Sequence, residues 1–337
     1  MTPRDLVKTT LNFENKTERV PRQMWTLPWA ETHAGDMIKN IHAEFPDDIV
    51  TAPAILAKPT IAKGDPYALG EFTDEWGCRF TNIHEGIIGE VKEASVKDED
   101  WNDWENIHIP TELLDFDVNQ VNAFCKSTDK FVLAGCNPRP FEQLQFIRTT
   151  QEFYMDLADP PANMLKFMDK MFAFYCELVE KWAKTAVDAI TFMDDWGSQN
   201  GLLINPAAWD QYFRPFYKEF IQIAHRNGKK AFMHSDGNTL LIYPRLIDLG
   251  LDAFNSQIFC MGLENLEQFK GKITFWGEID RQHLLPEGSA EDICRAVTAV
   301  KERLWDNGGC IAQCEFGPGA KKENVYTVFE TWNKFPS

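Results

Sequence analysis

Three segments of this 337-residue sequence carry acidic, imidazole and thiol side chains where short buried strands would end. They are FMDDWGSQ at residues 192–199, FMHSDG at residues 232–237 and GCIAQCEFG at residues 309–317. If these strands are parallel members of one barrel, their carboxyl ends open into a single mouth. The sequence therefore predicts one composite site, built from Asp194, Asp195, Gln199, His234, Asp236, Cys310 and Cys314.

Metal binding is the first chemistry that these residue types indicate. His234 and Asp236 are two residues apart, so on an extended segment both face the same side. With a thiolate from Cys314, they would leave the fourth position of a tetrahedral zinc open, as in a catalytic site. Cys310, four residues before Cys314, faces the same side and is a spare ligand. The alternative is that His234 and Asp236 hydrogen-bond each other or cap a helix, while Cys314 is a buried apolar residue.

Carboxylates at two other strand ends are candidates for catalysis. Asp194 and Asp195 are adjacent, and holding both near an apolar interior is costly unless each has a partner or a task. One of them could cap the following segment while the other faces the mouth. Glu278, in the segment WGEID, also ends a strand, and it is either a ligand, a proton carrier or a solvated residue at the rim.

Short apolar strands alternate with amphipathic helices from about residue 130 onward, which is typical of a parallel sheet covered by helices. We expect strands at residues 131–136, 189–194, 230–234, 252–256, 273–277 and 309–314, and helices at residues 164–184, 206–227 and 289–307. This repetition favours a (β/α)8 TIM barrel, an α/β fold. No G-x-G-x-x-G follows a strand, which argues against dinucleotide binding. We expect an N-terminal helical cap at residues 1–48 and the barrel with its insertions at residues 49–337, its first strand at residues 49–55.

Composition narrows the classes of partner. The formal net charge is −17, which would repel nucleic acid and anionic membrane surfaces. No apolar run approaches the roughly 20 residues of a membrane-spanning helix, and the first 20 residues lack a signal-peptide pattern. We therefore expect a cytoplasmic protein that binds neither membrane nor nucleic acid. Its eight scattered cysteines are expected to be reduced.

Four stretches together resemble the uroporphyrinogen decarboxylase superfamily, from about residue 130 to the end. They are DDWGSQNGLLINPAAWDQYFRPFYKEF, AFMHSDGNTLLIYPRLIDLGLDAFNSQ, FWGEIDRQHLL and CIAQCEFGPGAKKENV. The resemblance implies the TIM barrel, and a homodimer is expected from it. The superfamily contains porphyrinogen decarboxylases and zinc-dependent methyltransferases that work with corrinoid proteins.

The methyltransferase branch is the closer match. Its zinc is held by a His-x-Cys pair and a distal Cys; His234 and Cys314 match, whereas Asp236 stands where those relatives have Cys. A carboxylate hardens the site, which suits polarising an ether oxygen better than activating a thiol. The segment DEWGCRF at residues 74–80 resembles the branch that demethylates methoxylated aromatic compounds.

The function implied by this resemblance is transfer of a methyl group from a methoxylated donor to cobalt(I) of a corrinoid protein, with Zn²⁺ as Lewis acid. Asp194, Asp195 or Gln199 would orient the donor, and Glu278 or Gln257 would relieve the metal between turnovers. An aromatic slot would be lined by Trp25, Trp29, Trp76 and Trp196, although each could instead pack between cap and barrel.

Two other functions remain open at this point. Decarboxylases of the superfamily grip carboxylates with an arginine-rich N-terminal motif, and the corresponding region here offers Arg19 and Arg22. The surrounding tryptophans and the excess of negative charge suit an apolar donor better than a polycarboxylated tetrapyrrole. The third alternative is a barrel that only binds a small molecule.

Overall fold

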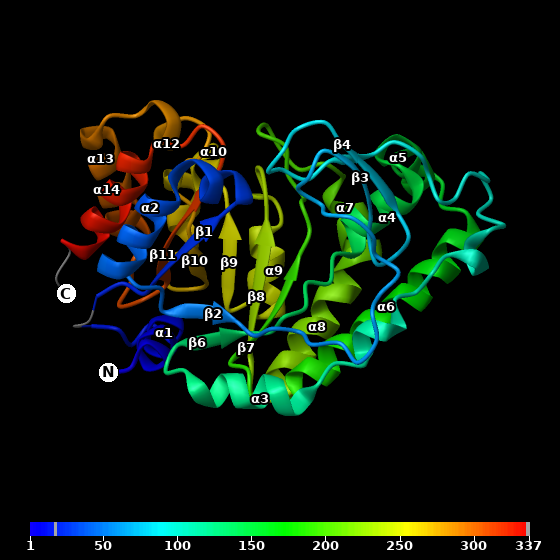
Figure 1. The fold of residues 1–337 in the computed structure, drawn as a ribbon, viewed down its shortest axis with the longest axis horizontal. Coiled ribbons are helices and arrows are strands. Elements are labelled where there is room, and N and C mark those ends of the chain that lie inside the picture. The colour runs from blue at the N-terminus through cyan, green and yellow to red at the C-terminus, as the bar shows by residue number, and fades with distance from the viewer. Residues whose placement is uncertain (17–18, 335–337) are drawn as a thin grey trace.

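The computed structural model describes residues 1–16 and 19–334. Within these residues, eight parallel strands form a nearly closed barrel in the order β1-β11-β10-β9-β8-β7-β6-β2 (Figure 1). The strands are β1 (Arg22–Thr26), β2 (Ile49–Thr51), β6 (Phe131–Leu133), β7 (Ala189–Met193), β8 (Lys230–Ser235), β9 (Ala253–Ser256), β10 (Thr274–Trp276) and β11 (Cys310–Phe316). The predicted (β/α)8 TIM barrel is confirmed, and so are its six strands after residue 130.

Helices lie around the barrel and at its ends. They are α1 (Pro3–Leu11), α2 (Pro28–Glu44), α3 (Val118–Ser127), α4 (Pro140–Arg148), α5 (Thr150–Ala158), α6 (Ala162–Ala183), α7 (Pro206–Ala208), α8 (Arg214–Arg226), α9 (Tyr243–Leu249), α10 (Ile258–Met261), α11 (Leu263–Leu266), α12 (Leu284–Glu287), α13 (Ala290–Leu304) and α14 (Lys322–Asn333). Single helical turns lie at Trp104–Asn106, Thr111–Leu114 and Glu267–Phe269. A separate antiparallel sheet of β3 (Gly70–Thr73), β4 (Arg79–Asn82) and β5 (Glu90–Val91) belongs to the insertion after β2.

The first barrel strand lies earlier in the chain than the sequence pattern suggested. β1 occupies residues 22–26, inside the region expected to be a helical cap, and pairs with β11 along its whole length. Residues 49–51 form the next strand, β2. The seam between β1 and β2 is joined through Asp48, whose backbone amide donates to the Arg22 carbonyl at 2.9 Å while its carboxylate accepts from the Arg22 amide at 2.9 Å. The five residues of β1 show no clear alternation of apolar and polar side chains, so the sequence pattern does not mark them as a strand.

Helix α1 closes the bottom of the barrel, at the amino ends of the strands (Figure 1). Its Val7 and Leu11 pack into the apolar cluster that fills the barrel interior. The Gly309 amide, just before β11, donates to the Thr10 carbonyl at 3.0 Å, and Arg4 pairs with Asp188, just before β7, at 3.0 Å. Apolar and polar contacts thus seal this end and leave the opposite end as the mouth.

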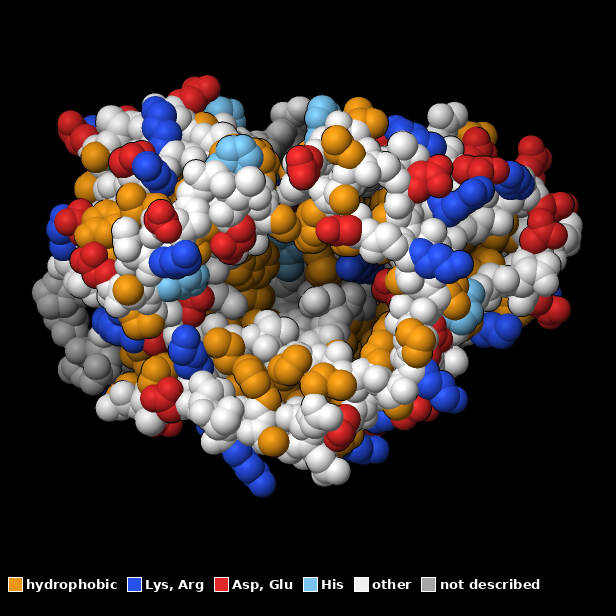
Figure 2. All heavy atoms as spheres, in the orientation of Figure 1, with side chains coloured by type: hydrophobic (Ala, Val, Ile, Leu, Met, Phe, Trp, Pro, Cys, Tyr) orange, Lys and Arg blue, Asp and Glu red, His pale blue; other side chains and the backbone are white. Residues whose placement is uncertain are grey.

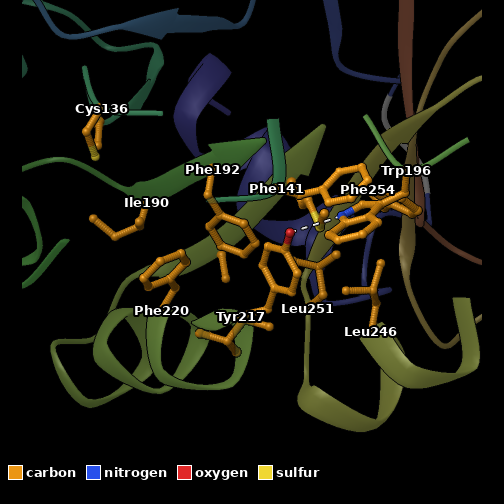
Figure 3. Close-up of a cluster of buried hydrophobic side chains, with 14 of the residues drawn as sticks. Cys136, Phe141, Ile190, Phe192, Trp196, Tyr217, Phe220, Leu246, Leu251 and Phe254 are labelled. Atoms are coloured by element: carbon orange, nitrogen blue, oxygen red, sulfur yellow. Dashed lines mark hydrogen bonds between the residues drawn. The ribbon is translucent and has the colours of Figure 1, made fainter. Parts of the chain in front are cut away.

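Side chains alternate between the barrel interior and the layer under the helices. On β8, Phe232 belongs to the interior cluster and Met233 to the layer beneath the helices. Figure 3 shows part of that outer layer, where Phe192 of β7 lies with Tyr217 and Phe220 of α8. A period of two therefore decides which side chains of each strand can reach the mouth.

Proline shapes the helix that follows β7. Asn205 caps its start by accepting from the Ala207 amide at 2.8 Å. The helix expected at residues 206–227 is interrupted by a π-helical turn at Trp209–Phe213, directly before α8, in which Pro215 is the second residue. Proline has no amide hydrogen, so the hydrogen-bond pattern must shift in the preceding turn.

No helix in the described part of the chain is long and apolar enough to cross a membrane. The eight cysteines, all among the described residues, are free thiols.

Candidate active site

Three of the predicted residues meet at the mouth of the barrel. His234, Asp195 and Asp236 each offer a ligand atom within 4.8 Å of the others, and they form a group that could hold a metal ion. The Nε2 atom of His234 lies 3.7 Å from an oxygen of Asp195 and 3.7 Å from Oδ1 of Asp236. We call these three residues the His234 group. Figure 2 shows this face of the molecule hollowed between the regions of α2 and of β3 and β4.

Hydrogen bonds orient the imidazole of His234. Its Nδ1 lies 2.6 Å from Oδ1 of Asn255, and the Asn255 amide nitrogen donates to the Trp276 carbonyl. Because Asn255 thus presents its oxygen to the ring, Nδ1 carries the proton and Nε2 faces the two aspartates. Burial lowers the pKa of His234, but the nearby Asp236 and Asp195 carboxylates outweigh it and raise that pKa.

A tight contact between two loops brings the aspartates together. Gly197 and Gly237 touch so closely that a Cβ on Gly237, whose φ is +76°, would lie 2.0 Å from the Gly197 carbonyl oxygen. The Gly197 amide donates to the Asp236 carbonyl at 3.1 Å, and the Asp236 amide donates to Oδ1 of Asp195 at 2.9 Å. Glycine at both positions is therefore required for this arrangement.

Cys314 does not belong to the His234 group. It is fully buried in the layer between strands and helices, level with Met24 of β1, and Cys310 lies in the same layer. The next residue, Glu315, faces the mouth, because β11 alternates like every strand. The ligand set of His234, Asp236 and Cys314 expected from the sequence is therefore not the one assembled here. Asp195 takes the third place.

Arg281 connects the His234 group to other carboxylates of the mouth. Its guanidinium pairs with Asp236, donates to Glu315 at 2.9 Å, and lies 3.5 Å from an oxygen of Glu278. Oδ1 of Asp236, which faces His234, is buried and has no hydrogen-bond partner among the described residues. That oxygen is therefore available to a cation.

Glu278 lies in a pocket beside the His234 group. The pocket has a volume of about 160 Å³ and is also lined by Gln199, Gln257 and Arg281. Gln199 donates to Gln257 at 3.4 Å, and the Gln257 oxygen accepts from the Gly237 amide at 3.0 Å. Glu278 is 2% exposed, and burial raises its pKa to about 8, against the opposing effect of Arg281. Its carboxyl group is therefore mostly protonated at neutral pH.

This raised pKa predicts how stability depends on pH. Between about pH 4.5 and 8 the folded protein keeps a proton on Glu278 that the unfolded chain releases, so this residue lowers the free energy of unfolding as pH rises. In urea titrations with a chelator, Glu278→Gln should lack that decline. The difference in slope between variant and wild type should approach about 1.4 kcal/mol per pH unit. Parallel pH profiles would contradict a raised pKa.

Asp194 has a structural role. It is fully buried and accepts from the backbone amides of Phe141 and Glu142 at 3.0 and 2.8 Å, at the start of α4. It also accepts from the Tyr217 hydroxyl at 2.6 Å, and Tyr217 in turn accepts from Trp196 at 3.0 Å (Figure 3). Of the adjacent pair, one aspartate thus caps a helix while Asp195 reaches the mouth.

The four tryptophans expected to line the site separate. The Trp25 ring lies 5.3 Å from the His234 ring. Trp196 is buried and stacks on Phe141 at 3.9 Å, in the core below the mouth. Trp29 stacks on the His33 ring at 4.3 Å, and Trp76 packs edge-on against α6. Of the four, Trp25 alone has a ring contact with the His234 group.

A family model for uroporphyrinogen decarboxylase matches residues 76–335. The chain belongs to the uroporphyrinogen decarboxylase family. No curated protein sequence matches it. Among solved structures, a methyltransferase from Methanosarcina mazei superposes with a TM-score of 0.70 over 99% of each chain at 17% identity, which shows a shared fold. A GH113 β-1,4-mannanase has a TM-score of 0.42 at 12% identity, over 94% of this chain and 100% of that chain.

In this member of the uroporphyrinogen decarboxylase family, the two N-terminal arginines, Arg19 and Arg22, make contacts at the seam between β1 and β2. Arg19 forms a two-pronged ion pair with Asp48 at 2.6 and 2.7 Å. Arg22 donates to the Pro46 carbonyl at 3.3 Å and lies over the Phe45 ring. Both guanidinium groups are therefore occupied by the protein itself.

Sequence reasoning missed Asn255, Arg281, Glu315 and Glu142, all of which lie at the mouth of this family member. Asn255 and Glu315 could have been found by continuing the alternation along β9 and β11. Arg281 follows a strand by five residues and gave no local signal. Glu142 begins α4; burial, with repulsion from Asp195, raises its pKa to about 7.

Proposed function

We propose that this protein is a methyltransferase that takes the methyl group of a methoxylated aromatic donor and passes it to the cobalt(I) of a separate corrinoid protein. Zinc would be held by His234, Asp236 and Asp195. The observation that carries the proposal is the His234 group itself: an imidazole with a fixed free nitrogen, facing two carboxylates at the mouth of a barrel of this family. The solved methyltransferase of the same fold supports this choice.

The residues present fit a divalent metal. Ligand atoms of a tetrahedral zinc lie roughly 3.3 Å apart when each bond is about 2.0 Å. The Nε2 atom of His234 lies 3.7 Å from each aspartate oxygen, so little movement is needed. The unpartnered Oδ1 of Asp236 would gain a partner, and Asn255 supplies the outer hydrogen bond typical of a metal-binding histidine.

The chain's own residues divide the remaining tasks. When bound, the metal would act as a Lewis acid toward the methoxy oxygen. Trp25 forms an apolar wall beside His234, against which a flat ring can lie. Glu278, protonated at neutral pH, gives its proton to the phenolate oxygen after the methyl group has left, which yields a phenol and a Glu278 carboxylate. Gln199 and Gln257 hydrogen-bond the donor in the adjacent pocket.

Charge and arginine placement make decarboxylation of a polycarboxylated substrate the weaker interpretation. The mouth carries Asp195, Asp236 and Glu315 close to Arg281, which is already paired. Arg19 and Arg22 are engaged at the seam. A tetrapyrrole with many carboxylates would be repelled here, because the arginines that could pair with those carboxylates are already paired with groups of the protein.

The test is methyl transfer itself. Purified protein, a panel of methoxyarenes and chemically reduced cob(I)alamin should form methylcobalamin and the matching phenol, followed by absorbance and chromatography. Stripping the metal with a chelator should abolish the reaction, and adding zinc should restore it. Elemental analysis of the same sample reports the metal. Undiminished transfer by metal-free protein would refute the role of the metal, and no transfer from any donor would refute the proposed function.

A further inference from the structure

Arg281 is held at the mouth by the turn that follows β10. The carboxylate of Asp280 accepts from the backbone amides of Gln282 and His283 at 2.8 and 2.9 Å. The Leu285 amide donates to the Asp280 carbonyl at 3.0 Å, and α12 begins directly after the turn. The guanidinium group of Arg281 is therefore carried on a short segment with its own hydrogen bonds.

The guanidinium group of Arg281 lies among three carboxyl groups. It pairs with Oδ2 of Asp236 and donates to Glu315 at 2.9 Å. The third carboxyl group, that of Glu278, lies 3.5 Å away and is mostly protonated at neutral pH. None of the three forms an ion pair with another lysine or arginine in the described part of the chain. Arg281 is therefore the cation that balances Asp236 and Glu315.

Asp236 stands between Arg281 and the position that a metal would take. Its Oδ2 faces the guanidinium group, while its Oδ1 is buried, has no hydrogen-bond partner among the described residues and lies 3.7 Å from Nε2 of His234. A carboxylate spreads one negative charge over both oxygens, so a cation at one oxygen weakens the attraction of the other for a second cation. The bond from His234 to Asn255 has the opposite effect, since it makes Nε2 a stronger donor to a metal.

We propose that Arg281 is a positioning residue that acts through Asp236. It keeps Oδ1 directed toward His234, and by drawing charge from the carboxylate it weakens metal binding and leaves a bound metal more electrophilic toward the methoxy oxygen. Glu315 limits this effect, because it engages the same guanidinium group. The inference rests on the metal site of the proposed function.

Metal affinity and methyl transfer should change in opposite directions when the charge of Arg281 is removed. Chelator-treated protein is titrated with Zn²⁺ in competition with a chromophoric chelator. Arg281→Gln, which removes the charge and keeps an amide donor, should bind Zn²⁺ about tenfold to a hundredfold more tightly than the wild type. The zinc-loaded variant should transfer the methyl group to cob(I)alamin about tenfold more slowly. Arg281→Lys keeps the charge and should resemble the wild type in both measurements.

A purely structural role of Arg281 would lower both quantities together. Zn²⁺ affinity that is unchanged or lower in folded Arg281→Gln would therefore overturn the proposal, as would undiminished transfer by that variant when it is loaded with zinc. Equal behaviour of the lysine and glutamine variants would overturn it too.

Glu315→Gln approaches the same guanidinium group from its other side, and it decides the question where Arg281→Gln does not fold. The variant removes the counter-charge of Arg281, so its Zn²⁺ affinity should fall about tenfold. An unchanged or higher affinity would contradict the proposal.

Arg303→Gln is the charge-matched control. Arg303 pairs with Glu267 at 3.2 Å near the closed end of the barrel, and its loss should leave Zn²⁺ affinity as in the wild type. The affinities are measured without donor or cobalt. The expected changes in Zn²⁺ binding, combined with no methyl transfer by any of the proteins, would refute the proposed function and leave the effect of Arg281 on the metal site standing.

Discussion

His234→Ala is expected to remove divalent metal from the purified protein and to lower methyl transfer by about a thousandfold or more. The variant loses the only imidazole of the His234 group and leaves two carboxylates facing each other. A Lewis acid lowers the activation barrier by several kcal/mol, and each 1.36 kcal/mol changes the rate by a factor of ten. Elemental analysis and the cobalamin assay measure the two effects on one preparation. Asn255→Ala, which frees the ring without removing a ligand, should cost about tenfold to a hundredfold in metal affinity.

Cys314→Ala is the matched comparison. Its thiol lies in the layer under the helices, so the variant should keep its metal and most of its activity while losing some stability. Loss of metal from folded Cys314→Ala, with metal retained by His234→Ala, would show that the ligands are not those of the His234 group.

Asp194→Ala is expected to lower the free energy of unfolding by about 3–5 kcal/mol. Three buried donors, the amides of Phe141 and Glu142 and the Tyr217 hydroxyl, would lose their acceptor, and each buried unsatisfied group costs about 1–3 kcal/mol. Urea denaturation followed by circular dichroism measures the change. A loss below about 1 kcal/mol would contradict the view that Asp194 anchors α4.

Two further variants separate the hydrogen bonds from a general effect of losing charge. Asp194→Asn keeps the volume and one acceptor oxygen, and should cost about half as much as the alanine variant. Asp36→Ala removes a fully exposed aspartate and should change stability by less than about 0.5 kcal/mol.

The sequence predicted the repeated part of the barrel and missed its beginning. The strands after residue 130 are bounded by helices with clear capping signals, such as the Ser289–Asp292 capping box of α13. β1 is not bounded by such signals, since it lies between the nine-residue helix α1 and a proline. It is recognisable as a strand only through its pairing with β11. Pairing between residues some 290 positions apart leaves no local pattern.

The sequence predicts only part of the candidate site, because only some of its residues are positioned by local structure. His234 and Asp236 are two apart on one segment, so their common direction follows from the extended backbone. Whether Cys314 or Glu315 shares that direction depends on where β11 starts, and an offset of one residue exchanges the two faces. The sequence indicates Asp195 as a catalytic or donor-orienting residue and not as a metal ligand, because the contact between Gly197 and Gly237 that brings it beside Asp236 joins two separate loops.

Closure of the lower end by α1 constrains the kinetics of the proposed reaction. The small donor and the large acceptor protein must both reach the site through the mouth of the barrel, and a docked corrinoid protein blocks the mouth. Catalysis should therefore follow a compulsory order, with the donor seated first and the demethylated product leaving last, after the acceptor has departed.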